Sequence, residues 1–168
     1  NVRWGYGYGK EYKTSTSIKN RQHDQDLGSH ATHVMGIAGG SSNGSSGQRY
    51  LGVAPKSELI AVSSNFNNIG ILEGIDYVFN IADSLSKPAV VNLSIGNHIG
   101  PHDGTSAFDI SLKSLVKKSR IVVGAAGNEG RDSLHIQHTF STSDSILYAF
   151  VQLNGGNTRP GGRSVLDI

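Results

Sequence analysis

Short apolar runs alternate along this chain with longer segments of helical periodicity, and this alternation constrains the fold more than any other feature. Apolar runs predict three buried strands, at residues 58–63, 89–94 and 121–126. Apolar residues at helical spacing predict three helices, at about residues 31–39, 71–85 and 106–118. Strands that alternate with helices indicate βαβ units and a parallel sheet covered on both faces. We therefore predict an α/β fold, with its site at the carboxyl ends of the strands.

The alternation stops after residue 130. Residues 134–140 and 146–153 have the composition of two strands joined by a short polar turn, with no helical pattern between them. The end of the chain is therefore predicted to be rich in β-structure.

Composition excludes several classes of protein. A chain of 168 residues is long enough for one domain with a core. Its formal net charge is only +2 and its basic residues are scattered apart from those at 117–120, which close a predicted helix, so a nucleic-acid partner is not indicated. No apolar run is long enough to predict a membrane-spanning segment, and the absence of cysteine excludes disulfides and a thiol nucleophile.

The predicted helix at 31–39 carries a histidine at its start. Ser29 is a suitable N-cap, so His30 lies where the polar loop ends and the helix begins. Small and apolar residues form one stripe of this helix, and its glycines allow another backbone to come close: Ala31, Val34, Ile37 and Ala38, with Gly36, Gly39 and Gly40. Taken alone, His30 is best explained as a capping or supporting residue. His33 is best explained as a packed side chain, because zinc-binding pairs on a helix usually have i,i+4 spacing.

Residues 30–38 read His-Ala-Thr-His-Val-Met-Gly-Ile-Ala, which resembles the His-Gly-Thr-His-Val-Ala-Gly-Ile block of the subtilases, the subtilisin-like serine peptidases. Further stretches resemble that family in the same order: Gly52-Val53-Ala54-Pro55 with Ala61-Val62, then residues 90–96, then residues 122–130. Ala31 replaces the usual glycine and Met35 the usual alanine. The collinear matches identify residues 28–130 as similar to part of a subtilase peptidase domain.

The resemblance implies roles for individual residues. His30 corresponds to the general base and Asn128 to the oxyanion donor of a serine peptidase. Ser94, Ile95 and Gly96 resemble the strand edge that pairs with substrate backbone, and Ala125, Ala126 and Gly127 resemble the facing wall of the primary specificity pocket. Local explanations stay open: a plain turn for Asn128, because asparagine tolerates left-handed backbone, and a strand-end hydroxyl for Ser94.

Two members of the family's catalytic triad have no match. Asp24 and Asp26 lie in a polar loop, whereas the family's aspartate ends an apolar strand, so we reject both as the orienting acid. Gly104-Thr105-Ser106-Ala107 imitates the family's serine motif, but it precedes Asn128 and lacks the proline. A helix N-cap explains Ser106 without catalysis.

We therefore predict that the chain is an interior part of a subtilisin-like serine endopeptidase, inactive by itself, whose parent hydrolyses polypeptides through an acyl-enzyme. Residues 1–130 would be a partial peptidase domain. Residues 131–168 would be either the start of a β-rich insertion, as in some bacterial subtilases, or a continuation of the same domain. We expect no cofactor or metal, a polypeptide substrate, and the remainder of the parent chain as partner. The resemblance favours an extracellular or cell-envelope location. A pseudo-peptidase or a peptide-binding module that uses the same groove is the alternative.

Overall fold

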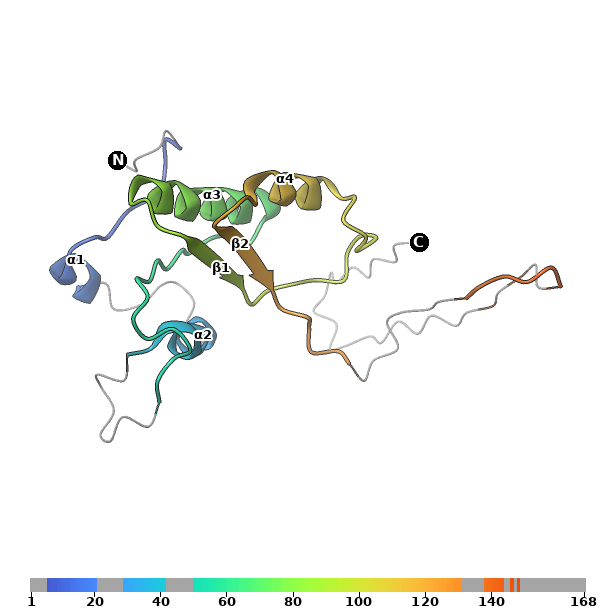
Figure 1. The fold of residues 1–168 in the computed structure, drawn as a ribbon, viewed down its shortest axis with the longest axis horizontal. Coiled ribbons are helices and arrows are strands. Elements are labelled where there is room, and N and C mark those ends of the chain that lie inside the picture. Colours follow the sequence, from blue (N-terminus) through green and yellow to red (C-terminus); the bar gives the residue numbers. More distant parts are fainter. Residues whose placement is uncertain are drawn as a thin grey trace, which may run out of the picture.

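The computed structural model describes residues 6–20, 29–41, 50–130, 138–143, 146 and 148 (Figure 1). Their secondary structure consists, in chain order, of α1 (Ser15–Lys19), α2 (His30–Gly39), α3 (Asn68–Ser84), β1 (Ala89–Leu93), α4 (Ala107–Leu115) and β2 (Arg120–Gly124). None of the helices in these residues combines the length and apolar character needed to cross a membrane.

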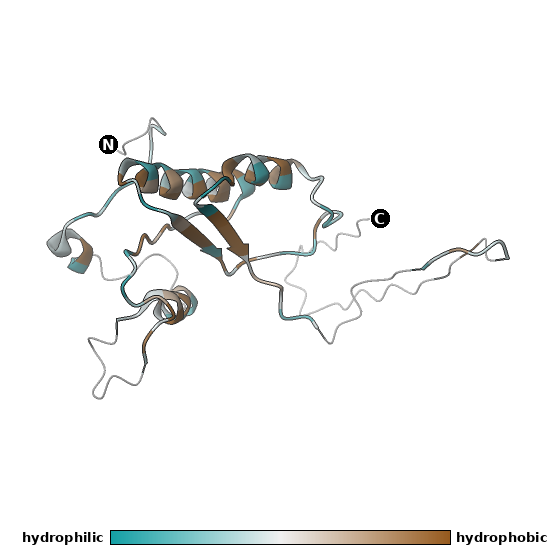
Figure 2. Ribbon diagram, viewed as in Figure 1, coloured by the Kyte–Doolittle hydropathy of each residue, from teal (hydrophilic) through white to brown (hydrophobic). Residues whose placement is uncertain are grey.

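The two strands are parallel neighbours, and the chain passes from β1 to β2 through α4. Leu93 is paired with Gly124, and the Ala125 N–H donates to the Leu93 carbonyl at 3.0 Å, just beyond the paired strands. α3 packs against both β1 and α4, and Figure 1 shows the two helices side by side. Figure 2 shows strands that are largely hydrophobic and helices α3 and α4 with mixed surfaces. The α/β prediction is confirmed.

The predicted strand at 58–63 is wrong. The described sheet contains β1 and β2 alone, and residues 58–63 form no strand. Leu59 lies against Gly39 of α2, and Val62 lies against Gly74 of α3. The apolar run therefore contacts helices, because apolar composition predicts burial but does not fix a backbone partner.

The sheet is also less covered than predicted. On the face of the strands away from α3, Val90, Ile121 and Val123 are 66%, 51% and 48% exposed. Helices cover both faces in the prediction, but within the described residues these three side chains remain open to solvent. The strands predicted at 134–140 and 146–153 lie largely outside the described residues, and residues 138–143 form no strand.

α3 supplies the core of the described residues. Asn67 caps its start, since the Asn67 side-chain oxygen accepts a hydrogen bond from the Gly70 N–H at 2.6 Å. Ile75, Phe79 and Ala82, spaced at i, i+4 and i+7, are buried. The prediction began this helix three residues late because it followed the apolar pattern and not the cap.

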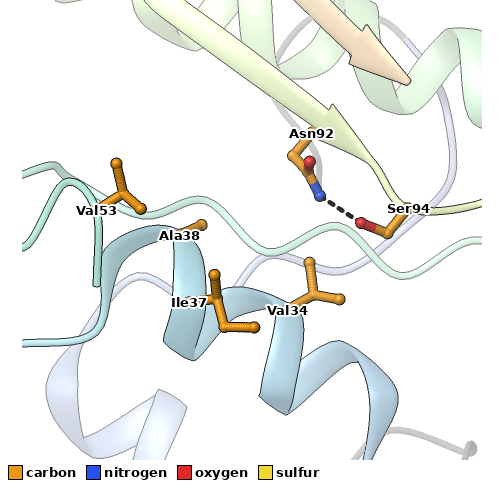
Figure 3. A pocket seen from close by; sticks show the side chains of 6 residues that line it. All are labelled: Val34, Ile37, Ala38, Val53, Asn92 and Ser94. Carbon is orange, nitrogen blue, oxygen red and sulfur yellow. Dashed lines mark hydrogen bonds between the residues drawn. The ribbon is translucent and has the colours of Figure 1, made fainter. Parts of the chain in front are cut away.

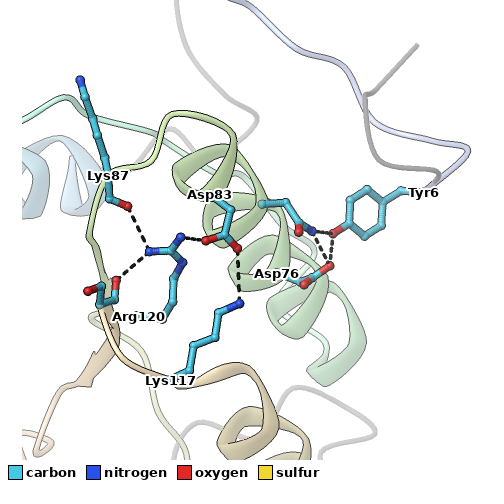
Figure 4. A network of polar contacts seen from close by, with 8 residues as sticks. Tyr6, Asp76, Asp83, Lys87, Lys117 and Arg120 are labelled. Carbon is cyan, nitrogen blue, oxygen red and sulfur yellow. Dashed lines mark hydrogen bonds and ion pairs between the residues drawn. The ribbon is translucent and has the colours of Figure 1, made fainter.

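Residues of the N-terminal segment are held against α3 by two tyrosine–carboxylate hydrogen bonds. The Tyr6 hydroxyl donates to Asp76, and the Tyr77 hydroxyl donates to Glu11 (Figure 4 shows the Tyr6 contact). Burial, and then the hydrogen bond to Asp76, raise the pKa of Tyr6 to about 12. Burial and Glu11 likewise raise the pKa of Tyr77. Both phenols therefore stay protonated at neutral pH and act as donors.

A buried arginine joins α3 to the start of both strands (Figure 4). Arg120, the first residue of β2, is 4% exposed and forms an ion pair with Asp83 near the end of α3. Its guanidinium also donates to the carbonyls of Lys87 at 3.0 Å and Ser119 at 2.8 Å. Lys117 adds a second cation, 3.4 Å from Asp83. The cluster fixes where β1 and β2 begin relative to α3.

Replacing Asp83 should destabilise the fold. Asp83→Ala leaves the Arg120 cation buried without its carboxylate, and we expect a loss of about 2–3 kcal/mol in the free energy of unfolding, measured by urea denaturation of the full-length protein. The double variant Asp83→Leu with Arg120→Met should recover much of this loss, because both charges are then absent.

Glu58→Ala is the matched control for Asp83→Ala. Glu58 pairs with Lys87 on the surface, where its side chain is 67% exposed. Exposed pairs of this kind contribute at most about 1 kcal/mol. Equal stability of Asp83→Ala and Glu58→Ala would contradict the structural role given to the Arg120 cluster.

Candidate active site

α2 presents His30 as its first residue. Ser29 is the N-cap, as predicted, and its carbonyl accepts from the His33 N–H at 2.9 Å. The expected cap bond from the Ser29 hydroxyl is absent, because ψ of Ser29 is 0° and a capping side chain needs extended backbone to reach the free amides.

His30 contacts the residue that follows β1. Its Nε2–H donates to the Ser94 carbonyl at 3.2 Å. Since β1 and β2 are adjacent and parallel, residues after Leu93 and after Gly124 leave the sheet at the same edge. The structure thus brings His30, Ser94 and Ala125 to the carboxyl edge where the prediction expected the site.

A cavity of about 220 Å³ separates α2 from the end of β1 (Figure 3). It is lined by Val34, Ile37, Ala38, Val53, Asn92 and Ser94. The Asn92 amide donates to the Ser94 hydroxyl at 2.9 Å, so the polar side of the cavity is internally bonded. Three of these residues belong to the predicted apolar stripe of α2. Val53 and Asn92 carried no signal of this role in the sequence.

Two of the three predicted glycines of α2 have no room for a side chain. A Cβ on Gly39 would lie 2.6 Å from the Leu59 side chain, and one on Gly40 would lie 2.6 Å from the Gly36 carbonyl of the same helix. The prediction for Gly36 is wrong, because a Cβ there would meet no atom within 4 Å. Gly52, which was not predicted, approaches α2 still more closely: a Cβ there would lie 2.4 Å from the Gly40 nitrogen.

Asn128 lies four residues beyond β2 and is exposed. Gly127 before it has φ +94°, a conformation that glycine adopts without strain. The Asn128 N–H donates to Oε2 of Glu129 at 2.8 Å, and the same carboxylate oxygen lies 3.8 Å from His98 Nε2. The sequence predicted no role for His98 or Glu129, although Glu129 lies within the matched stretch 122–130.

The two predicted walls of the groove follow the two strands. Ser94 is half-buried, Ile95 is 37% exposed and Gly96 is exposed, as are Ala125, Ala126 and Gly127. Both walls are therefore accessible at the carboxyl edge.

The residues rejected as triad members do not approach His30 where they are described. Ser106 caps α4: its hydroxyl donates to the Asp109 carboxylate at 2.6 Å and accepts from the Asp109 N–H at 3.1 Å. Asp24 and Asp26 lie outside the described residues. His33 is exposed, so the prediction that its side chain is packed is wrong. In the described part of the chain, no three His, Asp or Glu side chains gather in a way that could hold a metal ion.

Comparison with known proteins agrees with the sequence motifs. The family model described as "Subtilase family" matches residues 6–152. The chain is 34% identical over 124 residues to the thermophilic serine proteinase of Bacillus sp. strain AK1, covering 73% of this chain and 29% of that protein. It is 33% identical over 117 residues to proteinase T of Parengyodontium album, covering 66% of this chain and 36% of that protein.

A third relative, subtilisin-like protease 2 of Arthroderma otae, is 33% identical over 153 residues, which cover 86% of this chain and 31% of that protein. The chain thus spans about a third of the length of these relatives. No solved structure matches it.

Proposed function

Because this chain belongs to the subtilase family of serine peptidases, we propose that its parent protein hydrolyses polypeptides through an acyl-enzyme, with His30 as general base and Asn128 as oxyanion donor. The observation that carries the proposal is the contact between His30 and Ser94 at the carboxyl edge of β1. It brings an exposed imidazole to the strand end where a substrate backbone would lie.

His30 would take the proton of a serine nucleophile and return it to the leaving amine. In the described contact, Nε2 donates to the Ser94 carbonyl, so the proton lies on the nitrogen that must be free to accept. A carboxylate at Nδ1 would favour the opposite tautomer, because it accepts from Nδ1–H and leaves Nε2 as the acceptor. For His30 to act as a base, an orienting acid is therefore required in addition to the residues that the structure describes.

Asn128 would stabilise the oxyanion that forms as serine attacks the scissile carbonyl. Its side chain is exposed at the same edge of the sheet, beyond a glycine that turns the chain. An amide donor aimed at charge that develops only in the transition state accelerates the reaction without tightening substrate binding equally.

The serine nucleophile and the orienting aspartate would come from the remainder of the parent chain. Residues 1–130 would be part of its peptidase domain, and residues 131–168 the start of a β-rich insertion or a continuation of that domain. Hydrolysis outside the cytoplasm is supported by a relative named extracellular serine proteinase, from Thermus sp. strain Rt41A, to which the chain is 31% identical.

Active-site labelling tests this proposal. A fluorophosphonate should label the full-length protein on a serine outside residues 1–168 and should leave the 168-residue chain unlabelled, since no acyl-enzyme forms without the nucleophile. Mass spectrometry of the labelled peptide identifies the site. Stoichiometric labelling of Ser106, or of another serine in this chain, would contradict the assignment. A full-length protein that binds peptides but takes no label would instead be a pseudo-peptidase.

A further inference from the structure

A histidine–carboxylate contact lies between the loops that follow the two strands. His98 comes two residues after the wall formed by Ser94, Ile95 and Gly96, and Glu129 comes two residues after the wall that ends at Gly127. Nε2 of His98 lies 3.8 Å from Oε2 of Glu129, and the two side chains are 60% and 38% exposed. The pair therefore joins the segments that extend both walls of the proposed groove.

Oε2 of Glu129 also accepts the backbone N–H of Asn128 at 2.8 Å. The carboxylate lies over the turn itself, because a Cβ built on Gly127 would be only 2.8 Å from the same oxygen. This one oxygen thus contacts the His98 imidazole and also the backbone N–H of Asn128, the residue proposed as oxyanion donor.

The loop that carries His98 has a defined shape. The Asn97 side-chain oxygen accepts from the Ile99 N–H at 2.8 Å, and the Asn97 carbonyl accepts from His102 Nε2–H at 3.1 Å. The carboxylate of this loop, Asp103, is engaged elsewhere: hydrogen bonds from the side chain and then the backbone of Thr105 lower its pKa. Glu129 is accordingly the carboxylate that the described structure gives to His98.

We propose that Glu129, steadied by His98, is a positioning residue that holds Asn128 in register with the opposite wall. This inference rests on the proposed function, because it assigns Asn128 the oxyanion role. The pair does not touch the reacting atoms. It restrains the backbone that carries the Asn128 side-chain amide, and donor geometry matters because catalysis falls steeply when a donor shifts by about 1 Å.

Turnover of the full-length protein on a peptide substrate tests the arrangement. Glu129→Ala removes both contacts and should lower kcat about tenfold, with KM within about twofold, as expected for loss of a charged hydrogen bond that positions a donor. His98→Ala removes only the exposed pair and should lower kcat about threefold. His98→Lys places a permanent cation beside Glu129 and should recover most of that loss. Glu58→Ala, which removes an exposed and paired carboxylate elsewhere, should change neither constant.

A double-variant cycle separates positioning from two independent effects. If His98 acts through Glu129, His98→Ala should add no further loss in the Glu129→Ala background. Multiplicative losses in kcat would overturn the inference, as would a rise in KM without a change in kcat, because that result would place the pair in substrate binding.

Hydrogen exchange at the Asn128 amide provides a readout that does not depend on activity. Exchange should be about tenfold faster in Glu129→Ala, less accelerated in His98→Ala, and unchanged in Glu58→Ala, because Glu129 is the acceptor of this N–H among the described residues. Equal exchange in all variants would overturn the positioning role of Glu129. A full-length protein that shows this exchange pattern but hydrolyses no peptide would contradict the proposed function while supporting the hydrogen bond from Asn128 to Glu129.

Discussion

His30→Ala in the full-length protein is expected to abolish peptide hydrolysis, with kcat lower by about a millionfold, the loss typical of removing the base from a serine triad. The physical reason is that the serine hydroxyl is a poor nucleophile unless a neighbouring base takes its proton during attack. Steady-state kinetics on a chromogenic peptide measures the effect. Labelling by fluorophosphonate should fall in parallel, because it depends on the same activated hydroxyl.

His33→Ala is the matched control for His30→Ala. The two histidines lie one turn apart on α2, and His33 is exposed with its backbone N–H bonded to Ser29 in the normal helical manner. Its removal should change kcat by less than about threefold. Comparable losses in the two variants would mean that the helix and not the imidazole matters, and retained activity in His30→Ala would contradict the assignment of the base.

Helices α2, α3 and α4 and the β1–β2 pair could be predicted because their signals are local, whereas α1 was not predicted because residues 1–29 carry no sustained apolar period. Apolar residues at helical spacing marked α3 and α4, and Ser106 marked the start of α4 through a cap bond that the structure contains. The two apolar runs on either side of α4 then followed the rule that a crossover helix joins parallel strands. These features depend on residues a few positions apart.

The failed predictions depend on partners distant in sequence. Residues 58–63 have strand composition, but Leu59 and Val62 meet glycines of α2 and α3, and no local pattern encodes that choice. Likewise, nothing near Glu129 in the sequence indicates that its carboxylate meets His98, which lies on a loop after the other strand. The site residues named through family resemblance remain predictions, and the contact between His98 and Glu129 became visible only in the structure.

Asn128→Ala should lower kcat by about a hundred- to a thousandfold, equivalent to roughly 3–4 kcal/mol of transition-state stabilisation. KM should change little, since the amide meets a charge that is absent from the bound substrate. Steady-state kinetics on the full-length protein gives both constants.

Two variants separate this oxyanion role from that of a plain turn. Asn128→Asp keeps the size of the side chain but loses the amide donor, so it should be at least as impaired as Asn128→Ala, because a carboxylate would face the developing negative charge. Asn128→Gly permits any backbone conformation that the turn needs and also lacks the side-chain donor, so its kcat should be as low as that of Asn128→Ala. If Asn128→Gly instead retains wild-type kcat, the residue serves the turn alone, because glycine satisfies the backbone and supplies no hydrogen bond.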